Sequence, residues 1–381
     1  MIVGGKLSWR IVLRYTGVPV ALHVLLALAI VCAYELAGAT WLAIPALPVS
    51  VLAAAIGVLL AFRNNSAYDR WWEARTLWGA LVNTSRSFAR QVLTFLPRPT
   101  LDSSSESPSV ASASSKLLRT AVDSPMVGGA PPLVHASDGA VRDRFGKAID
   151  SSLSTPARGL LATLGTKQSW VESMGVGPGE VVTEDERELV YAQIGFVNAL
   201  RCHLRRQDPF LEISPFFRPT VLAALREEQN VPAAIVSWVG TRLLRIYGQG
   251  HGRDDVFRLM MFDETLTGLT NILGACERIK NTPIPLQYDV LPRAMIRAYL
   301  AILPLGVVAD LAWLTPFVTA LIAFLFIAMD AVGRDVETPF EDGYSDTPMS
   351  ALCRTIEINL RQMLGEQQLP PPLQPVDGML Y

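Results

Sequence analysis

The side chains best suited to catalysis or metal binding are few and widely separated in this sequence. Its four cysteines follow no Cys-x-x-Cys spacing and its four histidines are dispersed, so the cysteines are interpreted as reduced, buried thiols. Dense acidic groups occur only at residues 184–186 and 253–255. Each opens a predicted helix, where acids interact favourably with the helix dipole. With no phosphate-binding glycine loop after a strand, the sequence predicts no enzyme, no cofactor and no dedicated metal site.

A different kind of site is possible on an uncharged segment near the N-terminus. Residues 41–62, WLAIPALPVSVLAAAIGVLLAF, carry no charge, and Ala54, Val58 and Phe62 recur at intervals of four. Residues four apart share one face of a helix. Such a stripe packs against another helix or lipid, or it lines a pore in a symmetric oligomer, where stacked apolar rings can gate by dewetting. The periodicity alone leaves both interpretations open.

Segments long enough to hold this stripe in a membrane occur at both ends of the chain. Half of the 381 residues are hydrophobic and 18% are charged, against roughly 25% charged in soluble domains. Residues 19–37 and 41–62 are close to the ~20 residues that cross a bilayer. A second pair, residues 298–313 and 317–332, is shorter, and a hairpin buried in a soluble domain is its alternative interpretation. The sequence thus predicts an all-α membrane protein with four transmembrane helices.

Basic residues flank both hairpins on the same side. Lys6, Arg10 and Arg14 precede the first span, five arginines between positions 63 and 90 follow the second, and both short turns lack Lys and Arg. The positive-inside rule therefore predicts a multi-pass protein with both termini in the cytoplasm, in a cell or inner membrane. No cleavage site follows the first apolar segment, so we expect that segment to remain as a span.

The second span runs directly into a polar and aromatic stretch, FRNNSAYDRWWEARTLWG, residues 62–79. One helix over residues 41–95 would be ~80 Å long, far beyond the ~30 Å hydrocarbon thickness. It must therefore leave the membrane near Phe62, with Arg63 beginning the part in water. The aromatic residues that follow either pack against other helices or form an interfacial belt with no further role.

Residues 96–183 differ from the rest of the chain in composition. They include SSSESPSVASASS and GGAPP, which cannot bury enough apolar surface to become ordered. Further helices are predicted over residues 183–206, 219–229, 231–247 and 253–280. The predicted division is residues 1–95 for the first two spans and the cytoplasmic extension of the second, 96–183 for a mostly disordered cytoplasmic insertion, 184–292 for a cytoplasmic helical region, 293–335 for the last two spans, and 336–381 for a cytoplasmic tail.

Several motifs, in this order, resemble the bestrophin family. They are FRNNSAYDRWWEARTLWG, then ACERIKNTPIP at 275–285, WLTPFVTALIAFLFIAMDAVGRDVETPF at 313–340, and LCRTIEINL at 352–360. The likeness is to the bacterial and fungal branch and covers about residues 1–95 and 185–362. It implies a homopentameric ion channel with a single pore on the symmetry axis, four membrane helices per subunit and a helical cytoplasmic region.

The resemblance also implies pore positions. In the family the second membrane helix lines a narrow apolar neck, which falls on Ala54, Val58 and Phe62; the first two are smaller than the Ile or Phe usual in relatives. A cytoplasmic aperture falls on the helix predicted over 253–280, where Met260 is the best match and Met261 the alternative. A gap-filling core role is the other interpretation of Met260.

Animal bestrophins carry an acidic run that binds calcium, and this chain departs from it. The matching segment, TPFEDGYSDTP at 338–348, offers Glu341, Asp342 and Asp346, with three other residues interrupting the run. Calcium takes about six to eight oxygen ligands, so these are weak candidates and calcium activation is not expected.

The expected function is a passive channel for chloride or other monovalent anions, since the ring edges of a phenylalanine neck carry partial positive charge. The alternatives are a monovalent cation channel of the bacterial type and a membrane scaffold with a regulatory disordered loop. The expected partners are further copies of the chain in a homopentamer, the lipid bilayer and monovalent ions. A net charge of −2 gives no reason to expect nucleic acid binding.

Overall fold

The computed structural model describes residues 9–97, 182–248, 254–343, 345–376 and 379–380. The insertion predicted over residues 96–183 lies almost entirely outside the described residues. Within the described part of the chain the regular structure is helical, apart from one isolated bridge between Val376 and Met379. The predicted all-α fold class is confirmed for these residues.

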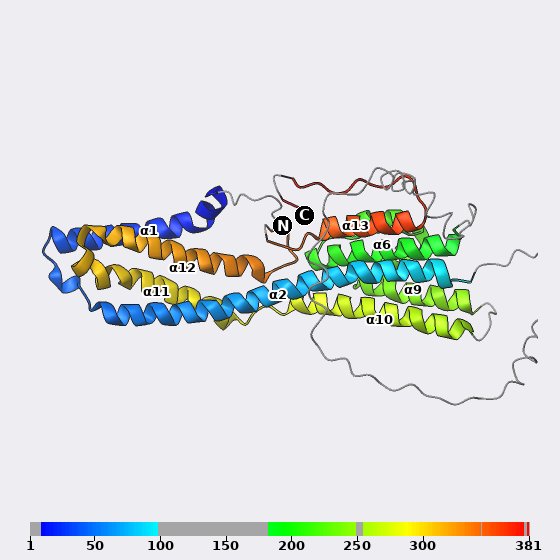
Figure 1. Ribbon diagram of the computed structural model, residues 1–381, viewed down its shortest axis with the longest axis horizontal. Helices are drawn as coiled ribbons and strands as arrows, with labels where there is room; N and C mark the ends of the chain where they lie inside the picture. The colour runs from blue at the N-terminus through cyan, green and yellow to red at the C-terminus, as the bar shows by residue number, and fades with distance from the viewer. Residues whose placement is uncertain (1–8, 98–181, 249–253, 344, 377–378, 381) are drawn as a thin grey trace, which may run out of the picture. The chain divides into compact units, whose positions relative to one another are not determined.

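Four long helices carry the apolar segments and lie against one another (Figure 1). They are α1 (Trp9–Glu35), α2 (Ala46–Phe95), α11 (Leu286–Leu311) and α12 (Thr315–Glu337). Three stretches are long and apolar enough to cross a membrane, Tyr15–Glu35, Thr40–Phe95 and Asp255–Glu337, and the third contains both α11 and α12. At 1.5 Å per residue, α11 and α12 are about 39 and 35 Å long, so neither is short for a crossing.

Helix α2 is continuous from the apolar segment into the polar one, as predicted, and its 50 residues span about 75 Å. It begins at Ala46 rather than at residue 41. The residues before it form a 3-10 turn, Thr40–Leu42, and Pro45 caps the helix in an extended conformation.

The second apolar pair is not a hairpin buried within the subunit. Apolar side chains of these helices are exposed, as at Val18, Leu22 and Leu25 on α1 and Phe317, Leu321 and Leu325 on α12. Helices with a wide exposed apolar face are suited to lipid rather than to water. Between α2 and α11 the packing is close, since a Cβ at Gly306 would lie 2.7 Å from Val49 Cγ2.

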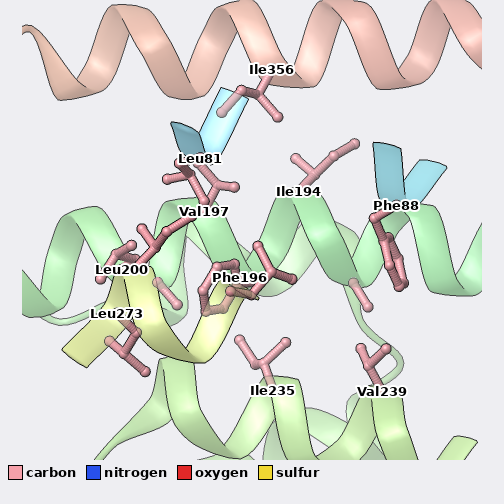
Figure 2. Close-up of a cluster of buried hydrophobic side chains, with 14 of the residues drawn as sticks. Leu81, Phe88, Ile194, Phe196, Val197, Leu200, Ile235, Val239, Leu273 and Ile356 are labelled. Atoms are coloured by element: carbon pink, nitrogen blue, oxygen red, sulfur yellow. The ribbon is translucent and has the colours of Figure 1, made fainter. Parts of the chain in front are cut away.

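The remaining helices form a second group. They are α6 (Glu184–Arg205), α7 (Phe210–Ile213), α8 (Pro219–Arg226), α9 (Val231–Tyr247), α10 (Asp254–Asn281) and α13 (Met349–Met363). Three of them, α6, α10 and α13, contact the second half of α2. Helix α6 contacts α2, α9, α10 and α13, and its Ile194, Phe196, Val197 and Leu200 lie among side chains of those helices (Figure 2). The predicted helices are found here, although α8 ends at Arg226 rather than at residue 229. All four cysteines are free, and three of them are buried.

Candidate functional site

Helix α2 has one buried face and one exposed face along its length. Ile56 and Leu60 pack against α11 and α12, and buried positions recur along the same face, mostly at intervals of three, four or seven residues, into the second half of the helix. Ala54, Val58 and Phe62 lie on the exposed face. Val58 is 56% exposed and Phe62 is 64% exposed. The three predicted neck positions therefore share a face that the helices of one subunit leave uncovered.

Arg63 follows Phe62 in the chain, and its side chain is fully buried. Its Nη1 lies 2.7 Å from Asp330 Oδ1, and its Nη2 lies 2.9 Å from Asp289 Oδ1. Glu337 Oε2 is 3.5 Å from Nη2. The expectation that Arg63 begins the part of the helix in water is wrong, because acidic side chains of α11 and α12 enclose its guanidinium.

Sequence reasoning did not find this group of charges, although one signal was present. Asp330 interrupts an apolar segment, and a charged residue in such a place calls for a partner. The partner is 267 residues away in the chain, a distance over which no periodicity or spacing rule pairs two residues.

The aromatic stretch after Phe62 joins several elements. The indole N–H of Trp71 donates a 2.6 Å hydrogen bond to the carbonyl of Ser345. The Arg70 guanidinium donates to the carbonyls of Ile279 and Glu337, in the last turns of α10 and α12, at 2.7 and 3.3 Å. An interfacial belt does not need such contacts, so the stretch has a structural role in connecting α2 to both helices and to the loop after α12.

Met260 lies on α10 and is 62% exposed, while Met261 is 43% exposed. A residue that fills a gap in the core of the subunit would be buried, so this interpretation of Met260 is wrong within one subunit. Asp263 and Glu264 follow by one helical turn and are exposed as well, so acidic groups adjoin Met260 on its face of α10. Gln91 of α2 donates to the carbonyl of Met261 at 3.5 Å, which holds this part of α10 against α2.

Two of the weak calcium candidates are paired with basic side chains. Glu341 Oε1 lies 2.5 Å from Lys280 Nζ, and Asp342 Oδ1 lies 2.6 Å from Arg205 Nη2. Among the residues that the structure describes, no three acidic, histidine or cysteine side chains are placed to hold a metal ion together. The structure therefore does not bring the three carboxylates into one site.

Asp346, the third candidate, is buried. Its Oδ2 accepts a 2.7 Å hydrogen bond from the backbone N–H of Gly343. Burial raises the pKa of Asp346 to about 6, although the hydrogen bond from Gly343 acts in the opposite direction. This carboxyl therefore closes its own loop and is not evidence for a cation site.

The acidic run at residues 184–186 has the structural role that the sequence predicted. Thr183 and Glu186 form a reciprocal cap at the start of α6, with hydrogen bonds of 2.7 and 3.2 Å. Asp185 pairs with Arg242 of α9. The acids at the start of this helix are thus engaged in capping and in ion pairing.

Comparison with known proteins identifies the class. The family described as "Bacterial/Fungal Bestrophin protein" matches residues 7–125 and 161–362. This match covers well over half of the chain, so the protein belongs to the bacterial and fungal bestrophin family, as its motifs indicated. Bestrophins are ion channels, which are not a class of enzyme.

Individual relatives support the same class. A voltage-dependent anion channel-forming protein of Ralstonia nicotianae is 27% identical over 322 residues, covering 84% of this chain and 78% of the relative. A protein of the same description from Escherichia coli K12 is 27% identical over 328 residues, covering 86% and 80%. The crystal structure of a bacterial bestrophin homologue from Klebsiella pneumoniae gives a TM-score of 0.62 at 23% identity, covering 92% of this chain and 98% of that one. The fold is therefore bestrophin-like.

Proposed function

We propose that this protein is a passive ion channel that conducts monovalent anions, chloride among them, through a pore formed by five copies of the chain. Membership of the bestrophin family and the description of the Ralstonia relative as anion channel-forming support this function. The observation that carries the proposal is the uncovered apolar face of α2. A water-soluble monomer would not leave Val58 and Phe62 exposed beside Ala54 in the middle of a membrane-type helix.

Around a symmetry axis, these positions form three stacked apolar rings. An apolar constriction gates by losing its water, and a wider ring loses water less readily. Ala54 is the smallest of the three, and Phe62 is the bulkiest, at the end of the neck nearest the polar stretch. We therefore assign the narrowest point of the neck to Phe62.

The proposed topology has four spans, α1, α2, α11 and α12, with both termini in the cytoplasm. The turns after α1 and α11 carry no Lys or Arg, in accord with an external position for both. The second group of helices then forms the cytoplasmic region. We place the aperture of that region at Met260, with Met261 as the alternative, because both side chains are exposed. We expect no activation by calcium.

Conduction of monovalent cations is the second candidate function, and a specific observation favours it. Asp263 and Glu264 are exposed beside Met260, and Asp69 is exposed on α2 beyond Phe62. Five-fold symmetry would turn each of these into a ring of negative charge, which raises the local concentration of cations. The apolar neck has no charged ring of its own that would oppose this effect.

The reversal potential of the purified protein in a planar bilayer under a KCl gradient tests the proposal. A shift toward the equilibrium potential of chloride would support an anion channel. A shift toward that of potassium would replace anions by cations in the proposal. Absence of current from verified pentamers, under a range of voltages, would contradict a constitutively conducting pore.

A further inference from the structure

We infer that Arg63 is a positioning residue for the pore neck, which it controls from the buried face of α2. The inference rests on the proposed function, because it assigns Phe62 to the pore. Arg63 belongs to a group of charges, here called the Arg63 cluster, whose centre, Arg63 and Asp330, is buried. The cluster holds one turn of α2 at a fixed rotation against α11 and α12. Its members are Arg63, Asp289, Arg293, Asp330, Arg334 and Glu337.

The geometry of Arg63 connects three helices at one point. One nitrogen of the guanidinium lies 2.7 Å from Asp330 of α12, and the other lies 2.9 Å from Asp289 of α11. A planar fork held at two ends resists rotation more strongly than a single contact does. The turn of α2 that contains Phe62 is thus fixed relative to both α11 and α12.

The cluster balances its charges. Arg293 pairs with Asp289 one turn away on α11, and Arg334 lies 3.2 Å from Asp330 on α12. Three arginines therefore face three carboxylates. Removal of one carboxylate would leave a surplus positive charge next to a guanidinium that has no access to water, and an uncompensated buried charge is strongly unfavourable.

Close backbone packing limits movement at the same place. A side chain at Gly333 of α12 would collide with Asn64 Oδ1 and would lie 3.5 Å from Arg63 Nη1. Asn64 also donates a 3.1 Å hydrogen bond to the carbonyl of Met329. Gly333 thus leaves room for the Asn64 side chain, and a rotation of α2 at Asn64 would break the hydrogen bond to Met329.

A role in positioning explains the cluster better than a role in stability does. Buried ion pairs contribute little net stability compared with apolar packing, and their best-attested use is to specify one arrangement of the chain. Phe62 and Arg63 are separated by only about 100° around the helix axis. Any rotation that moved the Phe62 ring relative to the axis of the pore would pull the Arg63 guanidinium away from its carboxylates.

Two substitutions test this role, and the chain offers a matched control. Asp330→Asn removes the negative charge of one partner of Arg63, and Arg63→Lys keeps the charge but cannot reach two carboxylates with one fork. The control is Asp185→Asn, which weakens the ion pair of Arg242 between α6 and α9. Single-channel conductance and open probability are measured for each variant after its pentameric assembly has been verified.

For both Arg63-cluster variants we expect a change of roughly tenfold in the ratio of open to closed channels, a typical coupling between two sites. The control should match the unmodified protein. If all variants assemble and conduct like the unmodified protein, the cluster is structural only and the inference is wrong.

A second measurement keeps the test valid if Asp330→Asn fails to assemble. Glu337→Gln removes the most distant partner, at 3.5 Å, and is expected to be milder. The double variant Phe62→Cys with Cys32→Ala then reports the orientation of position 62. Its new thiol is the accessible one, since the other cysteines are buried. We expect the rate of modification by a charged thiol reagent at position 62 to change in combination with Glu337→Gln and not with Asp185→Asn. Equal rates of thiol modification with and without Glu337→Gln would overturn the inference.

Failure of the proposed neck and failure of the positioning role give different results. If substitution of Val58 and Phe62 by Ala leaves the current of verified pentamers unchanged, the proposed neck is wrong, and the inference falls with it. If those substitutions change the current while the Arg63-cluster variants do not, the neck stands and only the positioning role is refuted.

Discussion

Gly343 and Asp346 close the loop after α12 on itself. The backbone N–H of Gly343 donates to Asp346 Oδ2 at 2.7 Å, and a Cβ at Gly343 would lie 3.2 Å from both carboxylate oxygens. The carboxylate is thus held in a tight loop with little room and little water. The same loop accepts the hydrogen bond from Trp71 at the carbonyl of Ser345. The conformation of the loop is therefore linked to the position of α2.

The buried Asp346 makes stability depend on pH. The pKa is about 6 in the folded protein, against a usual value of 3.8, so between these values the folded state holds a proton that the unfolded state has lost. The stabilisation that this bound proton gives the folded state is fully present below about pH 4, and it is lost as pH rises through about 6. In the unmodified protein this shift lowers the free energy of unfolding by up to about 3 kcal/mol as pH rises from 4 to 7. We expect Asp346→Asn to abolish that decline, which is followed through the melting temperature over the same pH range. The exposed Glu227→Gln serves as control. An unchanged pH profile in Asp346→Asn would contradict the assignment.

The apolar neck predicts the effect of smaller side chains. Replacing Val58 and Phe62 together by Ala widens two rings, so water should remain in the neck and single-channel conductance or open probability should rise. Leu325→Ala on α12 is the matched control, because Leu325 is equally apolar and exposed but lies on another span. Bilayer recordings of assembled channels measure the difference. Equal currents from the double variant and the control would refute the neck assignment.

The acidic pair beside Met260 predicts a change in selectivity. If that face of α10 lines the cytoplasmic part of the pore, Asp263→Asn with Glu264→Gln removes ten negative charges from a pentamer and shifts the reversal potential toward that of chloride. A shift of the order of 10 mV is expected at low ionic strength, and it should shrink as salt increases, since screening shortens the reach of surface charges. Glu227→Gln again provides a control away from α10. No shift at low salt would place this face outside the pore.

Deletion of residues 100–180 tests the scaffold alternative. A segment of this composition contributes little buried apolar surface, so the shortened chain should assemble and conduct like the full one. Native mass or light scattering measures assembly, and bilayer recording measures conduction. Loss of pentamers would assign the insertion a role in assembly, and retained pentamers with altered gating would assign it a regulatory one.

The elements that the sequence predicted well are those whose signals are local. The cap formed by Thr183 and Glu186 marks the start of α6, and the uninterrupted apolar and polar run of α2 marks one long helix. The start of α2 was misplaced because the residues around Pro45 are apolar yet extended. Hydropathy also underestimated α11, since its first turns, from Leu286, are helical but mixed in character.

The buried state of Arg63 was beyond sequence reasoning for a different reason. An arginine that follows an apolar span normally meets water or lipid headgroups, and nothing near Arg63 in the chain indicates otherwise. Its environment is built from Asp289 and Asp330, on helices that fold back from the far end of the sequence. Helix α13 lies within the segment predicted only as a cytoplasmic tail, although LCRTIEINL, which forms much of it, is one of the motifs that resemble the family.

The unbroken course of α2 also restricts how this protein can evolve. Each residue turns an α-helix by about 100°, so one residue inserted between Arg63 and Trp78 would rotate every later position out of its contacts. Trp78, fully buried among the helices around the second half of α2, would then turn out of that core while the apolar part of α2 stayed in place. Substitutions along this helix can be absorbed one at a time, but its residue count is fixed by the two sets of contacts that it must satisfy at once.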